Sequence, residues 1–160
     1  MSSKPNTLAA SAIIAVLGFA VISMVDLNLT IVPPAYAQSQ TFTAKLTGND
    51  ETPPVSTTAT GTAHFQLSSD GKQLNYDLST TNLQGFMMAH IHQGKAGESG
   101  KPVAELSMGK GTITSSDLKG SLAGKQMSDL VNMIKSGGAY VNVHTQQNQN
   151  GELRGQIMSG

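Results

Sequence analysis

The chain contains no cysteine and carries little charge. These two features exclude several kinds of scaffold, catalytic site and binding partner. Its 160 residues include 10 basic and 10 acidic side chains, so the formal net charge is zero. Without cysteine the chain has neither a disulfide scaffold nor a thiolate nucleophile. Without a basic excess it has no long-range attraction for nucleic acid or for an anionic membrane. We therefore predict a domain held by its packed core, with no nucleic-acid partner.

Familiar catalytic motifs are also missing. No serine lies in a Gly-x-Ser-x-Gly elbow, the turn that exposes a serine nucleophile. The glycines at 94, 97 and 100 are not followed by Gly-Lys-Ser or Gly-Lys-Thr, so they do not form a phosphate-binding loop. No carboxylate pair is marked as catalytic, and Asp50-Glu51 is expected to be surface charge or to organise its loop. These absences favour a protein that is not an enzyme.

The first 37 residues have the pattern of a signal peptide. Residues 8–25 are almost wholly apolar, and Ala35-Tyr36-Ala37 places small residues at the two positions that a signal peptidase reads. We predict a signal peptide over 1–37, a single mature domain over 38–160, and a secreted or cell-surface location. The alternative is a retained membrane anchor, because the apolar run approaches the ~20 residues of a spanning helix. Membrane contact is expected only through this segment.

The mature part of the sequence alternates polar and apolar residues, which is the period of a β-strand. Turn dipeptides separate two pairs of strands: Asp70-Gly71 and Asn150-Gly151, both of which tolerate a positive φ. About eight short strands with one helix predict an all-β, Greek-key sandwich or barrel. The predicted strands are 41–46, 62–67, 74–78, 87–92, 103–106, 111–114, 140–145 and 152–158.

One segment has a helical period instead. Apolar residues at 127, 130, 131 and 134 follow the i, i+3, i+4, i+7 spacing of a helix with one buried face. Ser128 is expected to cap its first turn, and Gly137-Gly138 to end it.

Three of the four histidines lie in two predicted strands. His90 and His92 flank Ile91, so both imidazoles point to the same side of their strand. In another strand His144 shares a face with Asn142, and Val141 and Val143 share the opposite face. If the apolar residues enter the core, all three imidazoles lie on the outer side of the sheet. His64, the fourth histidine, alternates with buried-type residues and is expected at a solvent-exposed face.

The three histidines have two interpretations that the sequence leaves open. A His-x-His pair with a third histidine from another strand suits copper or zinc, with one coordination position open. Met88 shares the face of His90, and a thioether ligand would favour copper, Cu(I) above all. Alternatively, the imidazoles hydrogen-bond to loop carbonyls and hold the glycine-rich loop 93–102 in place, with Met88 as a gap filler.

Polar residues near the predicted C-terminal hairpin form a second group. Glu152, Arg154 and Gln156 alternate along the last strand, and the preceding turn would bring them beside Asn142 and His144. Glu152 could then orient the free nitrogen of an imidazole, and Arg154 could hold a carboxylate bidentately. The alternative is a cross-strand ion pair and amide network that braces the sheet.

Three blocks of sequence resemble the CHRD domain, a family named after chordin and also found in microbial exported proteins. They are Ala-His-Ile-His-Gln-Gly at 89–94, Gly-Ala-Tyr-Val-Asn-Val-His-Thr at 138–145, and Gly-Glu-Leu-Arg-Gly-Gln-Ile at 151–157. The resemblance spans residues 42–158. It implies an immunoglobulin-like barrel or sandwich, distantly similar to the copper/zinc superoxide dismutase barrel, and implies no settled activity.

Three functions follow as hypotheses. The first is an exported, non-enzymatic binding or structural module that holds copper or zinc through His90, His92 and His144. The second is a mononuclear copper redox enzyme of the dismutase kind, since four histidines are too few for a dinuclear site. The third is a surface adhesion domain whose loops bind an extracellular protein or a glycan.

Overall fold

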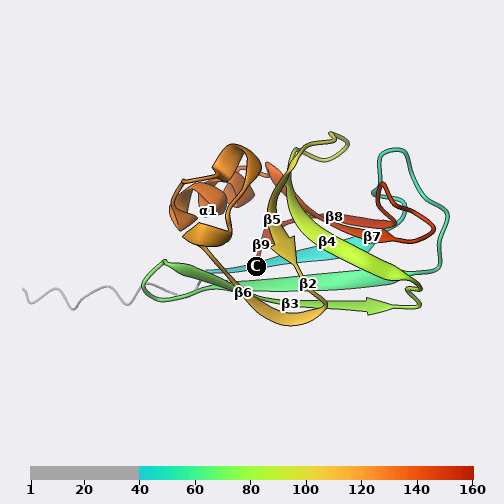
Figure 1. The fold of residues 1–160 in the computed structure, drawn as a ribbon, viewed down its shortest axis with the longest axis horizontal. Helices are drawn as coiled ribbons and strands as arrows, with labels where there is room; N and C mark the ends of the chain where they lie inside the picture. Colours follow the sequence, from blue (N-terminus) through green and yellow to red (C-terminus); the bar gives the residue numbers. More distant parts are fainter. Residues whose placement is uncertain (1–39) are drawn as a thin grey trace, which may run out of the picture. The chain divides into compact units, whose positions relative to one another are not determined.

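Nine strands in a single antiparallel sheet form the framework of residues 40–160, which are the residues that the computed structural model describes (Figure 1). The predicted signal peptide or anchor lies outside them. Within 40–160, no helix combines the length and the apolar character needed to cross a membrane. The strands are β1 Thr41–Thr47, β2 Thr60–Leu67, β3 Gln73–Thr81, β4 Phe86–Gln93, β5 Pro102–Leu106, β6 Gly109–Thr114, β7 Ala139–Thr145, β8 Leu153–Gln156 and β9 Met158–Ser159.

The order of the strands confirms the all-β prediction. The hydrogen-bonded order is β5-β4-β7-β8-β1-β2-β3-β6, and the sheet curves into a nearly closed barrel. The neighbours β4 and β7, β8 and β1, and β3 and β6 are not consecutive in the chain, as a Greek-key topology requires. The β4–β7 pair brings the two histidine-bearing segments side by side.

The alternation read from the sequence decides which side chains enter the barrel. Ala89 and Ile91 of β4, and Val141 and Val143 of β7, are at most 1% exposed and belong to the core. The residues between them therefore point to the outer face of the barrel, where loops cover them. This places the histidine-bearing face outside the core, as expected.

The helix α1, Met127–Lys135, lies at one end of the strands (Figure 1). All four of its predicted apolar positions are buried. The predicted cap was wrong: the N-cap is Gln126, and its N–H donates to the Asp129 carboxylate at 2.9 Å. Ser128 is already inside the first turn. Two short 3-10 helices, Ser115–Asp117 and Gly120–Leu122, precede α1.

The last predicted strand, 152–158, is two strands in the structure. β8 pairs with β7 through four residue pairs and touches β1 at Arg154. The N–H of Ile157 still donates to the Ala139 carbonyl at 3.0 Å, whereas Met158 pairs with Thr43 of β1. The chain thus crosses from one neighbour to the other at Ile157, whose side chain is fully buried.

Gly155 lets β8 lie close to β1. A Cβ atom on Gly155 would overlap the carbonyl oxygen of Lys45 and crowd the side chain of Leu46. The backbone of β1 cannot move aside, because it is paired along its whole length with β2. This close approach explains why the second glycine of the Gly-Glu-Leu-Arg-Gly-Gln block, Gly155, has no side chain.

We predict that Gly155→Ala destabilises the fold by at least about 2 kcal/mol, because the added methyl group pushes β8 away from β1. Urea denaturation followed by circular dichroism measures the effect. Ser79→Ala, at an exposed position of β3, is the control and should change stability by less than about 0.5 kcal/mol. Equal stability of the two variants would contradict the proposed close contact.

Candidate metal centre

Three imidazoles meet on the outer face of β4 and β7. One ring nitrogen from each of His90, His92 and His144 lies within 4.8 Å of the other two. The ring centroids are 5.3 to 5.8 Å apart, and the rings are tilted or edge-on to one another rather than stacked. The shared face that alternation predicted is therefore also a point of convergence.

Main-chain carbonyls orient two of the three rings. Nδ1 of His92 lies 2.9 Å from the Gly100 carbonyl, and Nδ1 of His144 lies 2.9 Å from the Gln149 carbonyl. A carbonyl oxygen only accepts, so each Nδ1 must carry the hydrogen and donate it. In the neutral ring this leaves Nε2 with a free lone pair, which is the form that binds a metal ion.

The free nitrogens are buried without partners. His92 and His144 are each 8% exposed, and Nε2 of both lacks a hydrogen-bond partner, as does the buried Nδ1 of His90. A buried polar atom without a partner costs about 1–3 kcal/mol. Three such nitrogens in one cluster are a concentrated cost that an ion bound between them would remove.

Burial also keeps two of the three imidazoles, those of His90 and His92, uncharged. Desolvation, together with the neighbouring imidazoles of His92 and His144, lowers the pKa of His90 to about 4. Desolvation likewise lowers the pKa of His92 below its ordinary value. Both rings are therefore neutral at neutral pH and have lone pairs available for coordination.

The spacing of the nitrogens suits a single ion. Three points no more than 4.8 Å apart lie within about 2.8 Å of a common centre, whereas bonds from nitrogen to zinc are about 2.0–2.1 Å. Side-chain rotations that bring each nitrogen inward by less than about 1 Å would close the site. The geometry is thus near to that of a trigonal set of ligands.

Behind His92, aromatic and cationic groups form a stack. The ring of Tyr140 lies parallel to His92, with centroids 5.1 Å apart, and the Arg154 guanidinium lies 3.6 Å from the centre of the Tyr140 ring. The Gly100 N–H donates to the Tyr140 hydroxyl at 3.1 Å. His92 and Tyr140 therefore hold the same loop residue, one through its carbonyl and the other through its N–H.

One hypothesis expected Arg154 to hold a carboxylate bidentately, and the structure shows a different role. Its guanidinium instead donates to the carbonyls of Lys95 and Glu98, at 2.9 and 2.7 Å. Gln156 acts in a similar way, with its amide nitrogen donating to the carbonyls of Gly94, Gly137 and Ala139. Both side chains fasten the β4–β5 loop to the sheet, and Gln156 also holds the segment between α1 and β7.

Glu152 does not orient an imidazole. Its carboxylate accepts from Thr57, Thr145 and Asn148, at 2.8, 2.6 and 3.0 Å, and these hydrogen bonds lower its pKa despite desolvation. It lies just before β8 and ties the β1–β2 and β7–β8 loops together, where Figure 1 shows them side by side at the end away from α1. The loop carbonyls take the orienting role.

Asn142 and Glu51 form a buried polar contact beside the centre. Asn142 pairs with His90 across the β4–β7 ladder, and its amide nitrogen donates to Glu51 at 3.4 Å. Glu51 is 6% exposed, which the sequence did not indicate, since a Thr- and Pro-rich loop gives no periodic sign of burial. Tyr140 was also missed as a site residue, because its aromatic ring reads as core.

The two remaining candidates occupy different surroundings. Met88 pairs directly with His144 in the β4–β7 ladder and is 45% exposed. His64 is exposed on β2, where its Nδ1 lies 3.4 Å from the Thr43 hydroxyl, far in the sheet order from the other three. His64 is therefore a surface histidine, as expected.

A comparison with models of known protein families identifies the domain. The model of the family described as the CHRD domain matches residues 42–157. The chain belongs to the CHRD domain family. The matched span contains β2 to β8 in full and all three clustered histidines, and CHRD domains are generally non-catalytic. No curated protein and no solved structure matched the chain.

We predict a pH-dependent effect of Glu51→Gln. Burial raises the pKa of Glu51, although Arg154 and Asn142 nearby favour the carboxylate. The folded state therefore binds this proton more tightly than the unfolded chain. The stabilisation is fully present below the ordinary pKa and is lost as pH rises through the folded pKa.

Urea denaturation of both proteins from about pH 4 to pH 7 measures this effect. The stability of the natural protein relative to the glutamine variant should fall as pH rises. Parallel stability curves would show that Glu51 titrates in the folded protein as it does in the unfolded chain.

Proposed function

We propose that this CHRD domain is a non-enzymatic module that binds one transition-metal ion, copper or zinc, through His90, His92 and His144. The observation that carries the proposal is the convergence of three imidazoles, two buried and one half-buried, each of which has a buried nitrogen without a hydrogen-bond partner. Nitrogen ligands of this kind are typical of copper and zinc sites, in contrast to the oxygen ligands of calcium and magnesium.

The alternative role, holding the loops in place, explains only half of this arrangement. Hydrogen bonds from Nδ1 of His92 and His144 do hold the loops that follow β4 and β7. They give no reason for the second nitrogen of each ring to be buried and turned toward another imidazole. In metal sites the same bond has both effects, since it fixes the ring and leaves the other nitrogen free to coordinate.

The protein around the cluster supports binding more than turnover. The imidazoles are enclosed by loops that Arg154, Gln156 and Tyr140 fasten through several hydrogen bonds each or through stacking. A ligand set held in this way is largely positioned before the ion binds, so that only small side-chain rotations are needed to close the site. We propose that the domain works outside the cell, secreted or on the surface, because the N-terminal sequence has the pattern of a signal peptide.

We predict that His90→Ala and His144→Ala each weaken binding of zinc and copper by at least about a hundredfold, since each removes one of three ligands. Isothermal titration of the exported protein with either metal measures the affinity. Zinc at about 100 times its dissociation constant should also stabilise the natural protein by about 2.7 kcal/mol. The alanine variants should lose this stabilisation.

His64→Ala is the matched control, because it removes an imidazole from the exposed face of β2 and leaves the cluster intact. It should bind both metals as the natural protein does. An affinity weaker than high micromolar in the natural protein, or equal affinities in all variants, would refute the metal site.

We predict that the exported protein begins at Gln38, because Ala35-Tyr36-Ala37 directly precedes it. N-terminal sequencing of the protein recovered from outside the cell checks this prediction. Replacing Ala37 with Arg should block cleavage and leave the protein attached to the membrane. Recovery of an uncleaved natural protein from the membrane fraction would favour the anchor instead.

A further inference from the structure

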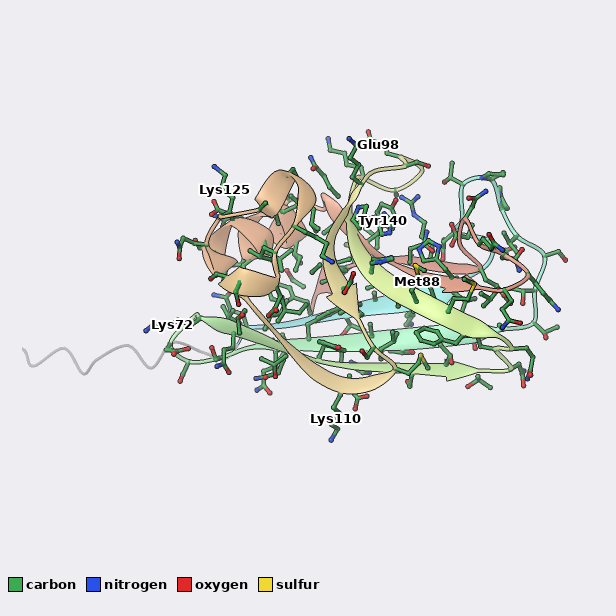
Figure 2. All side chains as sticks on the ribbon, in the orientation of Figure 1. Lys72, Met88, Glu98, Lys110, Lys125 and Tyr140 are labelled. Atoms are coloured by element: carbon green, nitrogen blue, oxygen red, sulfur yellow. The ribbon has the colours of Figure 1, made fainter. Side chains whose placement is uncertain are left out.

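Met88 lies where a fourth ligand to the proposed ion would lie. It precedes His90 by two residues on β4 and pairs directly with His144 on β7. Directly opposed residues in antiparallel strands share a face, with Cβ atoms about 4.5–5.5 Å apart. The Met88 side chain thus starts beside two of the three histidines, on the same face as Tyr140 (both labelled in Figure 2).

A β-bulge sets this position. The β4–β7 register shifts between Phe86 and Met88, so Met87 is an extra residue without a partner on β7. From Met88 onward the ladder is regular through His90 and His92. The bulge therefore separates two adjacent and equally exposed methionines, 44% and 45%, and only Met88 is in phase with the histidines.

The exposure of Met88 is not explained by core packing. Loops cover the cluster on the side of His92 and His144, each 8% exposed, whereas the neighbouring residue Met88 is 45% exposed. A flexible, unbranched side chain in this place can turn its sulfur toward the imidazoles without disturbing the barrel.

The donor set selects the charge of the ion. The cluster of metal-ligating residues within the described chain contains three histidines and no carboxylate or thiolate. No ligand neutralises the charge of an ion bound there. The free energy cost of burying an ion rises steeply with the magnitude of its charge. A monovalent ion is therefore favoured over a divalent one, and thioether sulfur is a ligand that Cu(I) accepts and zinc seldom takes.

We propose that Met88 is the fourth ligand and that the site is built for monovalent copper, with three imidazole nitrogens and one thioether sulfur. This inference rests on the metal site proposed above. It assigns the ion and gives Met88 a role distinct from that of Met87. The site would hold Cu(I) more tightly than zinc.

The test compares Met88→Leu with Met87→Leu in the exported protein. Leucine keeps the apolar volume and removes the sulfur, and Met87 is the matched control on the bulge. Competition with a chromogenic Cu(I) chelator, under anaerobic and reducing conditions, gives the Cu(I) affinity, and isothermal titration gives the zinc affinity. We expect Met88→Leu to weaken Cu(I) about tenfold or more and zinc less than about twofold, with no change for Met87→Leu.

X-ray absorption of the Cu(I) protein supplies an independent signature. One sulfur in the first coordination shell, present in the natural protein and in Met87→Leu but absent in Met88→Leu, supports the proposal. If Cu(I) binds through the histidines but Met88→Leu changes neither affinity nor spectrum, or weakens Cu(I) and zinc equally, the Met88 assignment is refuted and the histidine site stands. If neither metal binds the natural protein, the proposed function itself fails.

Discussion

The antiparallel register of β4 and β7 places His90 opposite Asn142 and Met88 opposite His144, and the candidate metal centre depends on this pairing. Because side chains alternate along a strand, a slip by one residue would turn the imidazoles into the barrel and Ile91 and Val143 toward solvent. The core opposes such a slip, since Ala89, Ile91, Val141 and Val143 are almost completely buried. Core packing and ligand placement are thus two results of one register.

Much of this arrangement could be predicted from the sequence. Alternation around Ile91 and Val143 placed His90, His92 and His144 on one face, and the helical period identified α1 with the right buried residues. These predictions succeeded because burial imposes a period on the chain, and a period can be read without knowing the partner. The same reasoning put His64 on an exposed face.

The rest depended on how loops pack against the sheet. The partners of Arg154 are main-chain oxygens of Lys95 and Glu98, and those of Glu152 come from two segments far apart in the sequence. Any residue type supplies a carbonyl oxygen, so the sequence carries no sign of such a partner. The burial of Glu51 also arises from the folding of its loop over Asn142, which no local pattern records. The Ser128 cap was wrong by two positions because the carboxylate of Asp129 reaches back to Gln126.

The hydrogen bonds of His92 and Tyr140 to Gly100 couple the orientation of an imidazole to the position of a loop. A Cβ on Gly100 would collide with the carbonyl of Gln93, so glycine alone allows the loop to close upon the last residue of β4. In that closed form the Gly100 carbonyl fixes His92, and its N–H is fixed by Tyr140. The orientation of the imidazole and the position of the loop are then a single degree of freedom. The loop cannot lift without releasing His92, and a large rotation of the ring breaks one of the hydrogen bonds that hold the loop.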